Sequence, residues 1–141
     1  MSEDLSLFLP YLLHRAAEQT GAAFERRYRD RYGMLRTEWR VLFHVGQMPG
    51  LTAKLICAKA GLHKTKVSRA IRALEKKRFL KRETVEEDRR SETLHLTRAG
   101  QAALKDLGQE AIAFDAAFEA QLGTEELATL KKTLLRLVEE G

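Results

Sequence analysis

The most constraining feature of the sequence is a basic, amphipathic segment from Gly61 to Thr97. At 100° per residue, four apolar residues fall on one side of a helix and predict a face that packs inward: Val67, Ala70, Ile71 and Leu74. The opposite side carries polar side chains and no carboxylate at its centre: Thr65, Arg69, Arg72 and Lys76. The segment therefore predicts a helix with one buried face and one basic, exposed face.

After this helix the pattern changes to short alternating stretches that predict two strands. We expect the strands at residues 80–85 and 92–96, with the turn at residues 86–90. Because the turn contains no Asn-Gly or Asp-Gly pair, we expect a longer loop and not a two-residue turn. The whole segment thus predicts a basic helix followed by a charged hairpin.

The positive charge of the chain is concentrated in this segment. The sequence has 25 Lys and Arg against 20 Asp and Glu, a net charge of +5. Residues 61–98 contain 12 of the basic and 6 of the acidic residues, so they carry +6 and the remainder carries −1. Such a concentration is expected for a partner with a phosphate backbone. For a basic helix seen alone, a solvated face is the simpler interpretation.

Three helices are predicted before the basic helix. The first covers residues 5–32, and its Pro10 marks either a kink or the true helix start. Thr37 is the expected N-cap of the second helix. Thr52 is the expected N-cap of the third, which Gly61 ends. The very short link that follows Gly61 predicts a helix-turn-helix.

Two more helices are predicted after the hairpin. Thr97 is the expected N-cap of a long helix that reaches about Gln121. Thr124 is expected to cap the last helix, with carboxylates in its first turn. The first and last helices contain more apolar residues than one core needs, so we expect parts of both to pack against another chain.

The bulk properties are those of a folded protein, with room for one domain or for one domain that carries an extension. The 141 residues are 44% hydrophobic and 32% charged, which argues against disorder. No apolar run approaches the ~20 residues that span a bilayer, and the N-terminus has no signal-peptide pattern, so we expect a cytoplasmic protein. The single cysteine, Cys57, excludes an internal disulfide framework and cannot supply a zinc site alone. No metal or cofactor is expected.

The order of elements and several short motifs resemble the MarR family of winged-helix transcriptional regulators. The motifs are Lys64-Thr65-Lys66-Val67-Ser68-Arg69, Leu74-Glu75-Lys76-Lys77, Asp88-Arg89-Arg90 and Leu96-Thr97-Arg98-Ala99-Gly100. The most specific part is the spacing from T-x-V-S-R through the D-x-R wing to L-T-x-x-G. The segment at residues 38–42 is also similar to the second helix of the family, and the resemblance covers nearly the whole chain.

The resemblance implies a mostly α fold with a small β-hairpin wing, of the α+β class. It implies a single MarR-type domain over residues 1–141, in which residues 34–98 form a winged helix-turn-helix DNA-binding lobe. Residues 1–33 and 99–141 would supply the helices that hold a homodimer together. Such a protein binds a pseudo-palindromic operator in double-stranded DNA and regulates transcription, as a repressor, without catalytic activity.

The resemblance also assigns roles to residues of the basic segment. The helix from about His63 to Arg78 would enter the major groove, where arginine prefers guanine. Its candidate DNA contacts are Thr65, Lys66, Ser68, Arg69 and Arg72. The wing would insert Arg89 or Arg90 into the adjacent minor groove, where narrow A·T geometry concentrates negative potential. Asp88 is expected to orient the wing arginine, because phosphate would repel its carboxylate.

Three residues depart from the family pattern. Lys66 stands where a hydroxyl residue is usual, which adds charge at the expense of specificity. His63 occupies the capping position of the basic helix and is a weaker cap than Asp or Ser. Arg78 replaces a glycine that commonly ends this helix. Since a left-handed residue costs more without glycine, we expect a differently shaped helix end.

Three other functions remain open from the sequence. An enzyme would have to use four histidines that fall on four predicted elements without a catalytic motif, so we expect no catalysis. A redox sensor would depend on Cys57, which has no second cysteine to resolve it and is more simply a packed core residue. An architectural protein that binds nucleic acid without regulating transcription would have the same basic surface.

The resemblance further implies a small effector, phenolic or anionic, between the dimer helices and the winged-helix lobe. Its binding would change the separation of the two basic helices in the dimer. The candidate pocket residues have polar end groups on largely apolar side chains, near the expected junction of the dimer helices with the winged-helix lobe. They are Tyr11, His14, Arg15, Trp39 and Arg40. Core or interface roles for these residues are at least as well supported.

Overall fold

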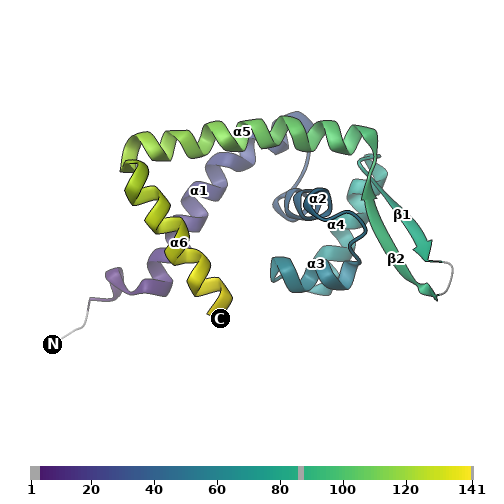
Figure 1. Cartoon of the computed structure of the whole chain (residues 1–141), viewed down its shortest axis with the longest axis horizontal. Helices are drawn as coiled ribbons and strands as arrows, with labels where there is room; N and C mark the ends of the chain where they lie inside the picture. Colours follow the sequence, from purple (N-terminus) through teal and green to yellow (C-terminus); the bar gives the residue numbers. More distant parts are fainter. Residues whose placement is uncertain (1–3, 86–87, 141) are drawn as a thin grey trace. The chain divides into compact units, whose positions relative to one another are not determined.

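The computed structural model describes residues 4–85 and 88–140, without the side chains of residues 85, 88–91 and 140. Over these ranges the chain is mostly helical and contains one antiparallel hairpin (Figure 1). The predicted mostly α fold with a small β-hairpin is therefore confirmed. In chain order the elements are η1 (Leu5–Leu7), α1 (Leu9–Tyr32), α2 (Arg36–Gln47), α3 (Ala53–Ala60), α4 (Lys64–Lys76), β1 (Leu80–Val85), β2 (Asp88–Leu96), α5 (Arg98–Leu122) and α6 (Thr124–Glu140).

The chain divides into two compact units, and the boundary falls inside α5. The first unit, Met1–Leu107, contains η1 to β2 and the beginning of α5. The second unit, Gly108–Gly141, contains the remainder of α5 and α6. Among the described residues, no helix combines the length and the apolar character needed to cross a membrane.

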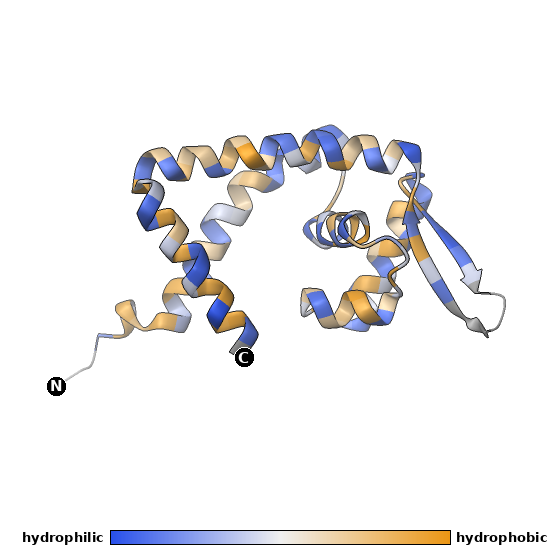
Figure 2. Cartoon of the chain, viewed as in Figure 1, coloured by the Kyte–Doolittle hydropathy of each residue, from blue (hydrophilic) through white to orange (hydrophobic). Residues whose placement is uncertain are grey.

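The core of the first unit lies among α2, α3, α4 and the hairpin, whose apolar residues are orange in Figure 2. Helix α4 contributes four residues that are at most 3% exposed, which confirms the predicted inward face: Val67, Ala70, Ile71 and Leu74. Other elements contribute Val41, Leu42, Val45, Ile56, Leu80 and Leu94. Full burial of a large apolar side chain stabilises a fold by about 1.5–3 kcal/mol. Because the core fills the inner face of α4, only the outer face is available to a partner.

Helix α1 has Pro10 in its first turn, so this residue marks the helix start and not a kink. The helix continues through Gly21 without interruption and ends at Gly33, whose φ of 65° is left-handed. Near this end Tyr28 is 2% exposed, and its ring stacks on that of Trp39 in α2 with the centroids 5.8 Å apart. The last turns of α1 are thereby packed against the core.

The start of α2 differs from the prediction. Its N-cap is Leu35, which makes no side-chain hydrogen bond to the helix, and Thr37 already belongs to the first turn. The N–H of Trp39 donates to the carbonyl of Leu35 at 3.0 Å, so helical bonding begins before the predicted cap. Thr37 as N-cap is therefore wrong, because the fully buried Met34 fixes where the chain enters the helix.

The hairpin has a longer second strand and a shorter connection than predicted. β2 begins at Asp88, so residues 88–90 belong to a strand and not to the turn. Val85 pairs with Asp88 after a register shift next to Thr84, and residues 86 and 87 lie outside the described residues. The expected longer loop is therefore wrong. No residue type in the sequence predicts this shift in register, which brings the ends of the two strands together.

The end of α4 is closed by a pair of backbone hydrogen bonds. Arg78 has a φ of 66° and is the one non-glycine residue with a positive φ in the described part of the chain. Its N–H donates to the carbonyl of Glu75 at 2.9 Å, and that of Phe79 donates to Leu74 at 2.9 Å. These are the two bonds of a Schellman motif. The helix end thus has the shape that glycine would give it, and the expectation of a different shape is wrong.

Thr97 fastens this helix end to the start of α5. Its hydroxyl donates to the carbonyl of Arg78 at 2.6 Å and accepts the N–H of Gly100 at 3.0 Å, which confirms Thr97 as the N-cap. Its own N–H donates to the carbonyl of Phe79 at 3.1 Å. A Cβ at Gly100 would lie only 2.0 Å from the oxygen of Phe79. We call these contacts of Arg78, Phe79, Thr97 and Gly100 the α4–α5 junction, and they require glycine at position 100.

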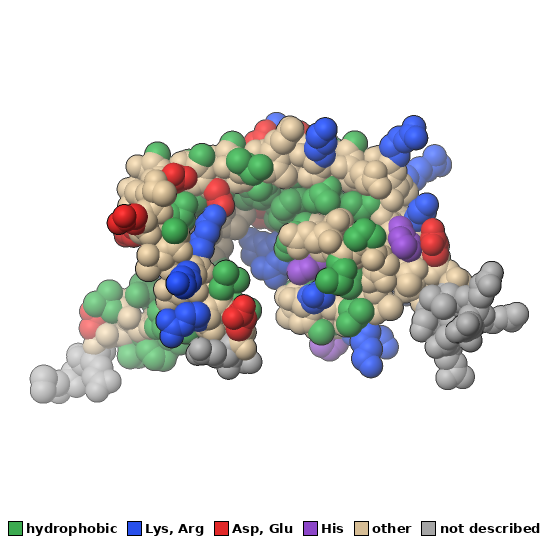
Figure 3. Space-filling model, in the orientation of Figure 1, with side chains coloured by type: hydrophobic (Ala, Val, Ile, Leu, Met, Phe, Trp, Pro, Cys, Tyr) green, Lys and Arg blue, Asp and Glu red, His purple; other side chains and the backbone are tan. Residues whose placement is uncertain are grey.

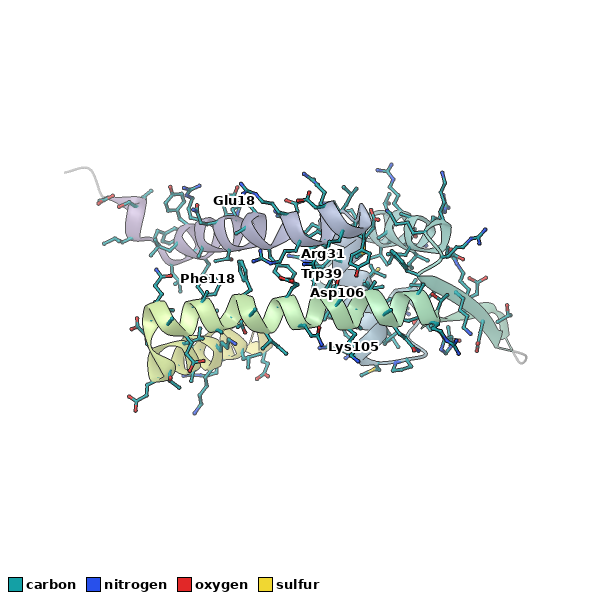
Figure 4. All side chains as sticks on the ribbon, turned by 90° about the horizontal axis from the view of Figure 1, so that it is seen from above. Glu18, Arg31, Trp39, Lys105, Asp106 and Phe118 are labelled. Carbon is teal, nitrogen blue, oxygen red and sulfur yellow. The ribbon has the colours of Figure 1, made fainter. Side chains whose placement is uncertain are left out.

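The end of α1 contacts the same region through Asp106 of α5, which Figure 4 labels with Arg31. Arg31 Nη1 donates to both carboxylate oxygens of Asp106 at 2.9 and 3.0 Å, and the hydroxyl of Tyr32 donates to one of them at 2.5 Å. The hydrogen bond from Tyr32 lowers the pKa of Asp106, while burial raises the pKa of Tyr32. Tyr32 also meets Phe79 edge to face, with ring centroids 5.8 Å apart.

The second unit consists of the last part of α5 and of α6, joined by Gly123 with a φ of 93°. Glu125 and Glu126 lie in the first turn of α6, as expected for carboxylates at the positive end of a helix. Thr124 as the cap of α6 is wrong, because Thr124 is already the first residue of the helix and the N–H of Leu127 donates to the carbonyl of Gly123 at 3.1 Å. Several large apolar side chains of this unit are exposed: Ile112, Leu130, Leu135, Leu137 and Val138.

Two glycines of α5 provide a matched test of the α4–α5 junction. Gly100→Ala is expected to lower the free energy of unfolding by about 2–3 kcal/mol, because the new methyl group overlaps the carbonyl of Phe79. Gly108→Ala is expected to raise it by up to ~1 kcal/mol, since a Cβ there meets nothing within 4 Å and alanine favours a helix. Urea unfolding followed by circular dichroism, at one protein concentration, measures both. A Gly100→Ala variant as stable as the parent would contradict the expected overlap.

Candidate nucleic-acid interface

A tight turn sets the direction of α4 relative to α3. The side chain of Thr52 caps α3 by accepting the N–H of Leu55 at 3.2 Å, and Gly61 ends the helix with a φ of 65°. Both predictions for this helix are confirmed. His63 then caps α4, because its Nδ1 accepts the N–H of Thr65 at 3.2 Å. Since so few residues separate the two helices, α4 leaves the turn in a fixed direction.

The outer side of α4 carries the five DNA contacts predicted on this helix. Four of them are exposed, and Ser68 is half-buried. The exposed polar residues of α4, which we call the basic face, are Lys64, Thr65, Lys66, Arg69, Arg72 and Lys76; Lys64 belongs to the first turn and lies toward the inner side. Within the described residues, no carboxylate forms an ion pair with a lysine or arginine of the basic face. Figure 3 shows Lys and Arg side chains in blue at the edge of the lobe formed by α3 and α4.

An ion pair holds the end of α4 against α2. Nζ of Lys77 lies 2.5 Å from Oε1 of Glu38. The side chain of Glu38 is only 5% exposed, so without Lys77 its carboxylate would be a buried charge with no compensation. Glu38 also lines a hollow of ≈ 270 Å³ together with Lys66 and Arg69. The beginning of α2 therefore lies beside the basic face.

The base of the hairpin is attached to the core by backbone bonds. The N–H of Leu94 donates to the carbonyl of Leu51 at 2.8 Å, and the carbonyl of Leu94 accepts the N–H of Gly50 at 3.1 Å. The side chains of Leu80 and Leu94 are buried beneath these bonds. β2 is thus fixed to the loop between α2 and α3.

Further along the hairpin, Arg82 connects β1 to two other elements. Its Nε donates to Oε1 of Glu75 in α4, and its Nη1 donates to Oε2 of Glu92 in β2, both at 2.9 Å. The hydrogen bond to Glu92 is the largest cause that raises the pKa of Arg82, and the bond to Glu75 adds to it. The positive charge of Arg82 is therefore compensated within the protein, unlike the charges of the basic face.

The three predicted wing residues lie on the outer part of β2. Asp88, Arg89 and Arg90 are strand residues by their backbone. Their side chains lie outside the described residues, so their roles stay predictions. Because the same strand continues to Glu92, the position of these residues depends on how the hairpin is fixed at that point.

The five predicted effector residues fall into two groups in one chain. In α1 they are Tyr11, His14 and Arg15, all exposed; in α2 they are the half-buried Trp39 and the exposed Arg40. About 20 Å of helix separates Arg15 from Tyr28, the residue that stacks on Trp39. Figure 4 accordingly shows Glu18, which pairs with His14, well apart from Trp39. A single chain does not gather the five residues into one pocket.

The α2 group belongs to a row of packed rings. The ring of Trp39 lies 5.9 Å from that of Phe43, which in turn lies 4.3 Å from His44. Burial is the main cause that lowers the pKa of His44, and the nearby charges of Lys59 and Arg40 lower it further. Since Trp39 also stacks on Tyr28 of α1, it is a packing residue of the α1–α2 contact. Because its pKa is lowered, His44 near Arg40 is uncharged at neutral pH.

Sequence reasoning missed the three ion pairs that position α4 and the hairpin. Glu75 and Arg82 are 7 positions apart, and Arg82 and Glu92 are 10 apart. Because α4 ends at Lys76 and Arg82 lies on a strand, helical spacing predicts neither contact: the way β1 leaves α4 brings Arg82 to Glu75, and the register of the hairpin brings it to Glu92. Glu38 and Lys77 are 39 positions apart and meet only through the packing of α2 on α4. Lys64 was also missed, although it precedes Thr65 in the same turn.

Cys57 is half-buried in α3, and its carbonyl accepts the N–H of Leu62 at 3.2 Å. It is the one cysteine of the sequence. In the described part of the chain, no group of three or more His, Cys, Asp or Glu residues is placed to hold a metal ion. The structure does not test the redox-sensor hypothesis, which continues to depend on this thiol alone.

Comparisons with known sequences agree with this architecture. A model of the MarR family matches residues 32–91, which contain α2, α3, α4 and β1. A protein of Thauera aromatica, assigned as a transcriptional regulatory protein for the hcr operon, is 30% identical over 106 residues. The match covers 75% of this chain and about 60% of the length of that relative.

Solved structures share the fold over nearly the whole chain. The PcaV transcriptional regulator from Streptomyces coelicolor, in complex with its natural ligand, superposes with a TM-score of 0.81 at 20% identity, covering 99% of this chain and 97% of that one. FabT from Streptococcus pneumoniae, in complex with DNA, superposes with a TM-score of 0.77 at 22% identity, covering 96% of each chain. At these identities the likeness is one of fold.

The pair of Glu38 and Lys77 can be tested against a neighbouring lysine. Lys77→Met is expected to lower the free energy of unfolding by about 2–3 kcal/mol, because it leaves the buried carboxylate uncompensated. Lys76→Met, on the basic face, is expected to change it by less than ~0.5 kcal/mol. Adding Glu38→Gln to Lys77→Met should recover part of the loss, since an amide costs less to bury than a charge. Equal urea midpoints for the two single variants would refute this role of the pair.

Proposed function

We propose that the chain is a transcriptional regulator of the MarR family, whose model matches residues 32–91, and that it binds an operator in double-stranded DNA and represses transcription. The family model matches the lobe that carries the basic face of α4. The DNA complex of FabT and the regulatory role assigned to the Thauera aromatica relative support the same function. The family is one of regulators and not of enzymes, and we propose no catalytic activity.

The observation that carries this proposal is the contrast between the two sides of α4. The inner side is filled by the core, whereas the basic face is exposed and lacks ion pairs to described carboxylates. Such a helix fits the major groove, where Arg69 and Arg72 would read guanine through their paired donors. Lys64 and Lys66 would neutralise phosphates and release counterions. Thr65 and Ser68 would add hydroxyl contacts near the start of the helix.

The hairpin would act as a wing on the adjacent minor groove. Arg89 or Arg90 would enter the groove where A·T pairs narrow it and deepen its negative potential. Asp88 would hold the wing arginine in place instead of contacting DNA. With α4 in the major groove, each chain would cover one half-site.

We propose that two chains form the functional unit, with residues 34–98 as the DNA-binding lobe and residues 1–33 and 99–141 as dimerisation helices. Exposed apolar side chains at both ends of the chain support this division. Those near the N-terminus are Leu5, Leu7, Phe8, Leu9, Tyr11 and Leu12, and those of the second unit were named above. Two lobes spaced by about 34 Å would match a pseudo-palindrome with half-sites one turn apart.

A small phenolic or anionic effector would release the repressor from DNA. The proposed pocket contains Tyr11, His14, Arg15, Trp39 and Arg40. Since one chain separates the first three from the last two, a single pocket of all five requires α1 of a second chain. The natural ligand in the PcaV complex supports effector binding by this fold. Any effector must bind the DNA-free arrangement more tightly to shift the equilibrium.

Selection of genomic fragments by the purified protein, at fixed physiological salt, tests the DNA-binding proposal. We expect a preference of ~10³ or more for one operator over random DNA. Arg69→Ala should weaken binding by roughly 10–100-fold and relax base preference, whereas Arg90→Ala should weaken binding and lower the salt dependence. Lys105→Ala, an exposed cation of α5, is the control and should leave affinity unchanged. A lack of sequence preference would instead favour the architectural protein.

Sedimentation velocity tests the proposed homodimer. The parent chain should sediment at twice its mass of 16.1 kDa. Replacing Leu135 and Leu137 together by Glu should yield monomers, because it places two charges on an apolar surface that is already exposed in one chain. Lys132→Glu, on the same helix, removes no apolar side chain and should leave the dimer intact. A parent protein that sediments as a monomer would exclude this arrangement.

A further inference from the structure

The inner face of the hairpin is apolar at its base and charged further out. Opposite residues in the register share one face, so Leu80 and Leu94 lie on the same face as Arg82. The next pair on this face is Thr84 and Glu92. Leu80 is 3% and Leu94 1% exposed, while Thr84 is exposed. Arg82 therefore stands where the hairpin leaves the core.

Arg82 is also where the hairpin is tied to α4. Its bond to Glu75 is the one side-chain hydrogen bond between α4 and the hairpin among the described residues. Its bond to Glu92 ties the neighbouring strand to the same guanidinium. One planar group thus connects α4, β1 and β2, and a guanidinium suits this task because its donors point in fixed directions.

The outer part of the hairpin magnifies any change in strand direction at Arg82. About 10 Å of strand separates Arg82 from Val85, where β1 ends. A change of 10° in the strand direction at Arg82 would move that end by about 2 Å, more than a hydrogen bond tolerates. The placement of Asp88, Arg89 and Arg90 is therefore sensitive to the geometry at Arg82.

Arg82 is poorly suited to bind a phosphate itself. Two carboxylates share its charge, so the group of Glu75, Arg82 and Glu92 has a net charge of −1. The raised pKa of Arg82 agrees with a cation that is held by these partners. Each member of the group is 34% to 42% exposed, so the group is worth little as a source of overall stability.

We infer that Arg82 is a positioning residue, which through Glu75 and Glu92 fixes the angle between α4 and the wing so that both reach the same half-site. The inference rests on the proposed DNA binding and adds a role for residues outside the predicted contacts. In this arrangement two acidic residues on a basic surface improve DNA binding, although each of them repels phosphate.

The sharpest test removes the two carboxylates and keeps Arg82. Glu75→Ala combined with Glu92→Ala makes the DNA-binding lobe more positive by two charges, so electrostatic attraction alone predicts tighter binding. Positioning predicts the opposite: loss of contacts to the flanking minor groove and on the order of tenfold weaker binding. The probe is the operator found in the selection experiment, at fixed salt.

Two footprints on the same DNA separate the wing from α4. Protection of guanine N7 from methylation reports the major groove, and protection from hydroxyl radicals reports the flanking minor groove. At saturating protein, the double variant should lose the flanking protection and retain the guanine protection. Arg82→Lys keeps the charge but not the two fixed donors, and it should behave in the same way. Lys81→Ala, the exposed neighbour on the outer face, is the control and should retain both protections.

Several outcomes would overturn the inference. Tighter binding by the double variant with both protections retained would show that the carboxylates only repel DNA. Loss of both protections together, or a parent protein without flanking protection, would show that Arg82 does not position a wing on DNA. If Arg69→Ala still relaxes base preference in these cases, the proposed function stands without the inference. An absence of any operator preference would refute the proposed function itself.

Discussion

Two backbone carbonyls, those of Arg78 and Phe79, accept hydrogen bonds from Thr97, and the first unit is arranged around this contact. The contact joins three elements at one place: the end of α4, the base of β1 and the start of α5. Gly100 lets the helix approach the carbonyl of Phe79, and Tyr32 packs against the ring of Phe79 from α1. The end of α4 that carries no predicted DNA contact is therefore fixed to α1, α5 and the hairpin, while the turn at Gly61 fixes the start of the helix.

Ion pairing separates the cations that hold the fold from those available to a partner. Lys77, Arg82 and Arg31 each lie against a carboxylate of another element, and they connect α4 to α2, β1 to α4, and α1 to α5. The cations of the basic face have no such partner among the described carboxylates. Because compensated charges contribute little to long-range attraction, the cations of the basic face contribute more to the surface field than Lys77, Arg82 and Arg31 do. The net charge of +5 understates how strongly that face would attract an anion.

Local patterns in the sequence were enough to predict most of the elements. The apolar period of α4, the caps at Thr52 and Thr97, and the stop at Gly61 all follow from interactions within a few residues. The errors concern features that distant packing decides. Burial of Met34 moved the start of α2, a register shift shortened the hairpin connection, and bonds to Thr97 hold Arg78 in a conformation that glycine prefers.

The candidate site likewise contains residues that the sequence could predict and residues that it could not. The outer residues of α4 could be named from helical spacing, because exposure on a helix follows from its period. The bonds of Arg82 to Glu75 and Glu92 could not, because they depend on the hairpin register and on where α4 ends. Residues that would contact DNA are thus readable from the sequence, whereas residues that hold those contacts in place required the fold.

Arg78 has a further consequence for how this sequence can change over generations. A left-handed conformation costs an ordinary residue about 1–2 kcal/mol, and glycine largely escapes that cost. Nothing in the structure explains why arginine stands here. Replacing Arg78 with glycine would therefore stabilise the fold, at a position that lies at the far end of α4 from its predicted DNA contacts. A lineage with glycine at position 78 could accept a destabilising change elsewhere, including a new side chain on the basic face that alters the proposed recognition of an operator.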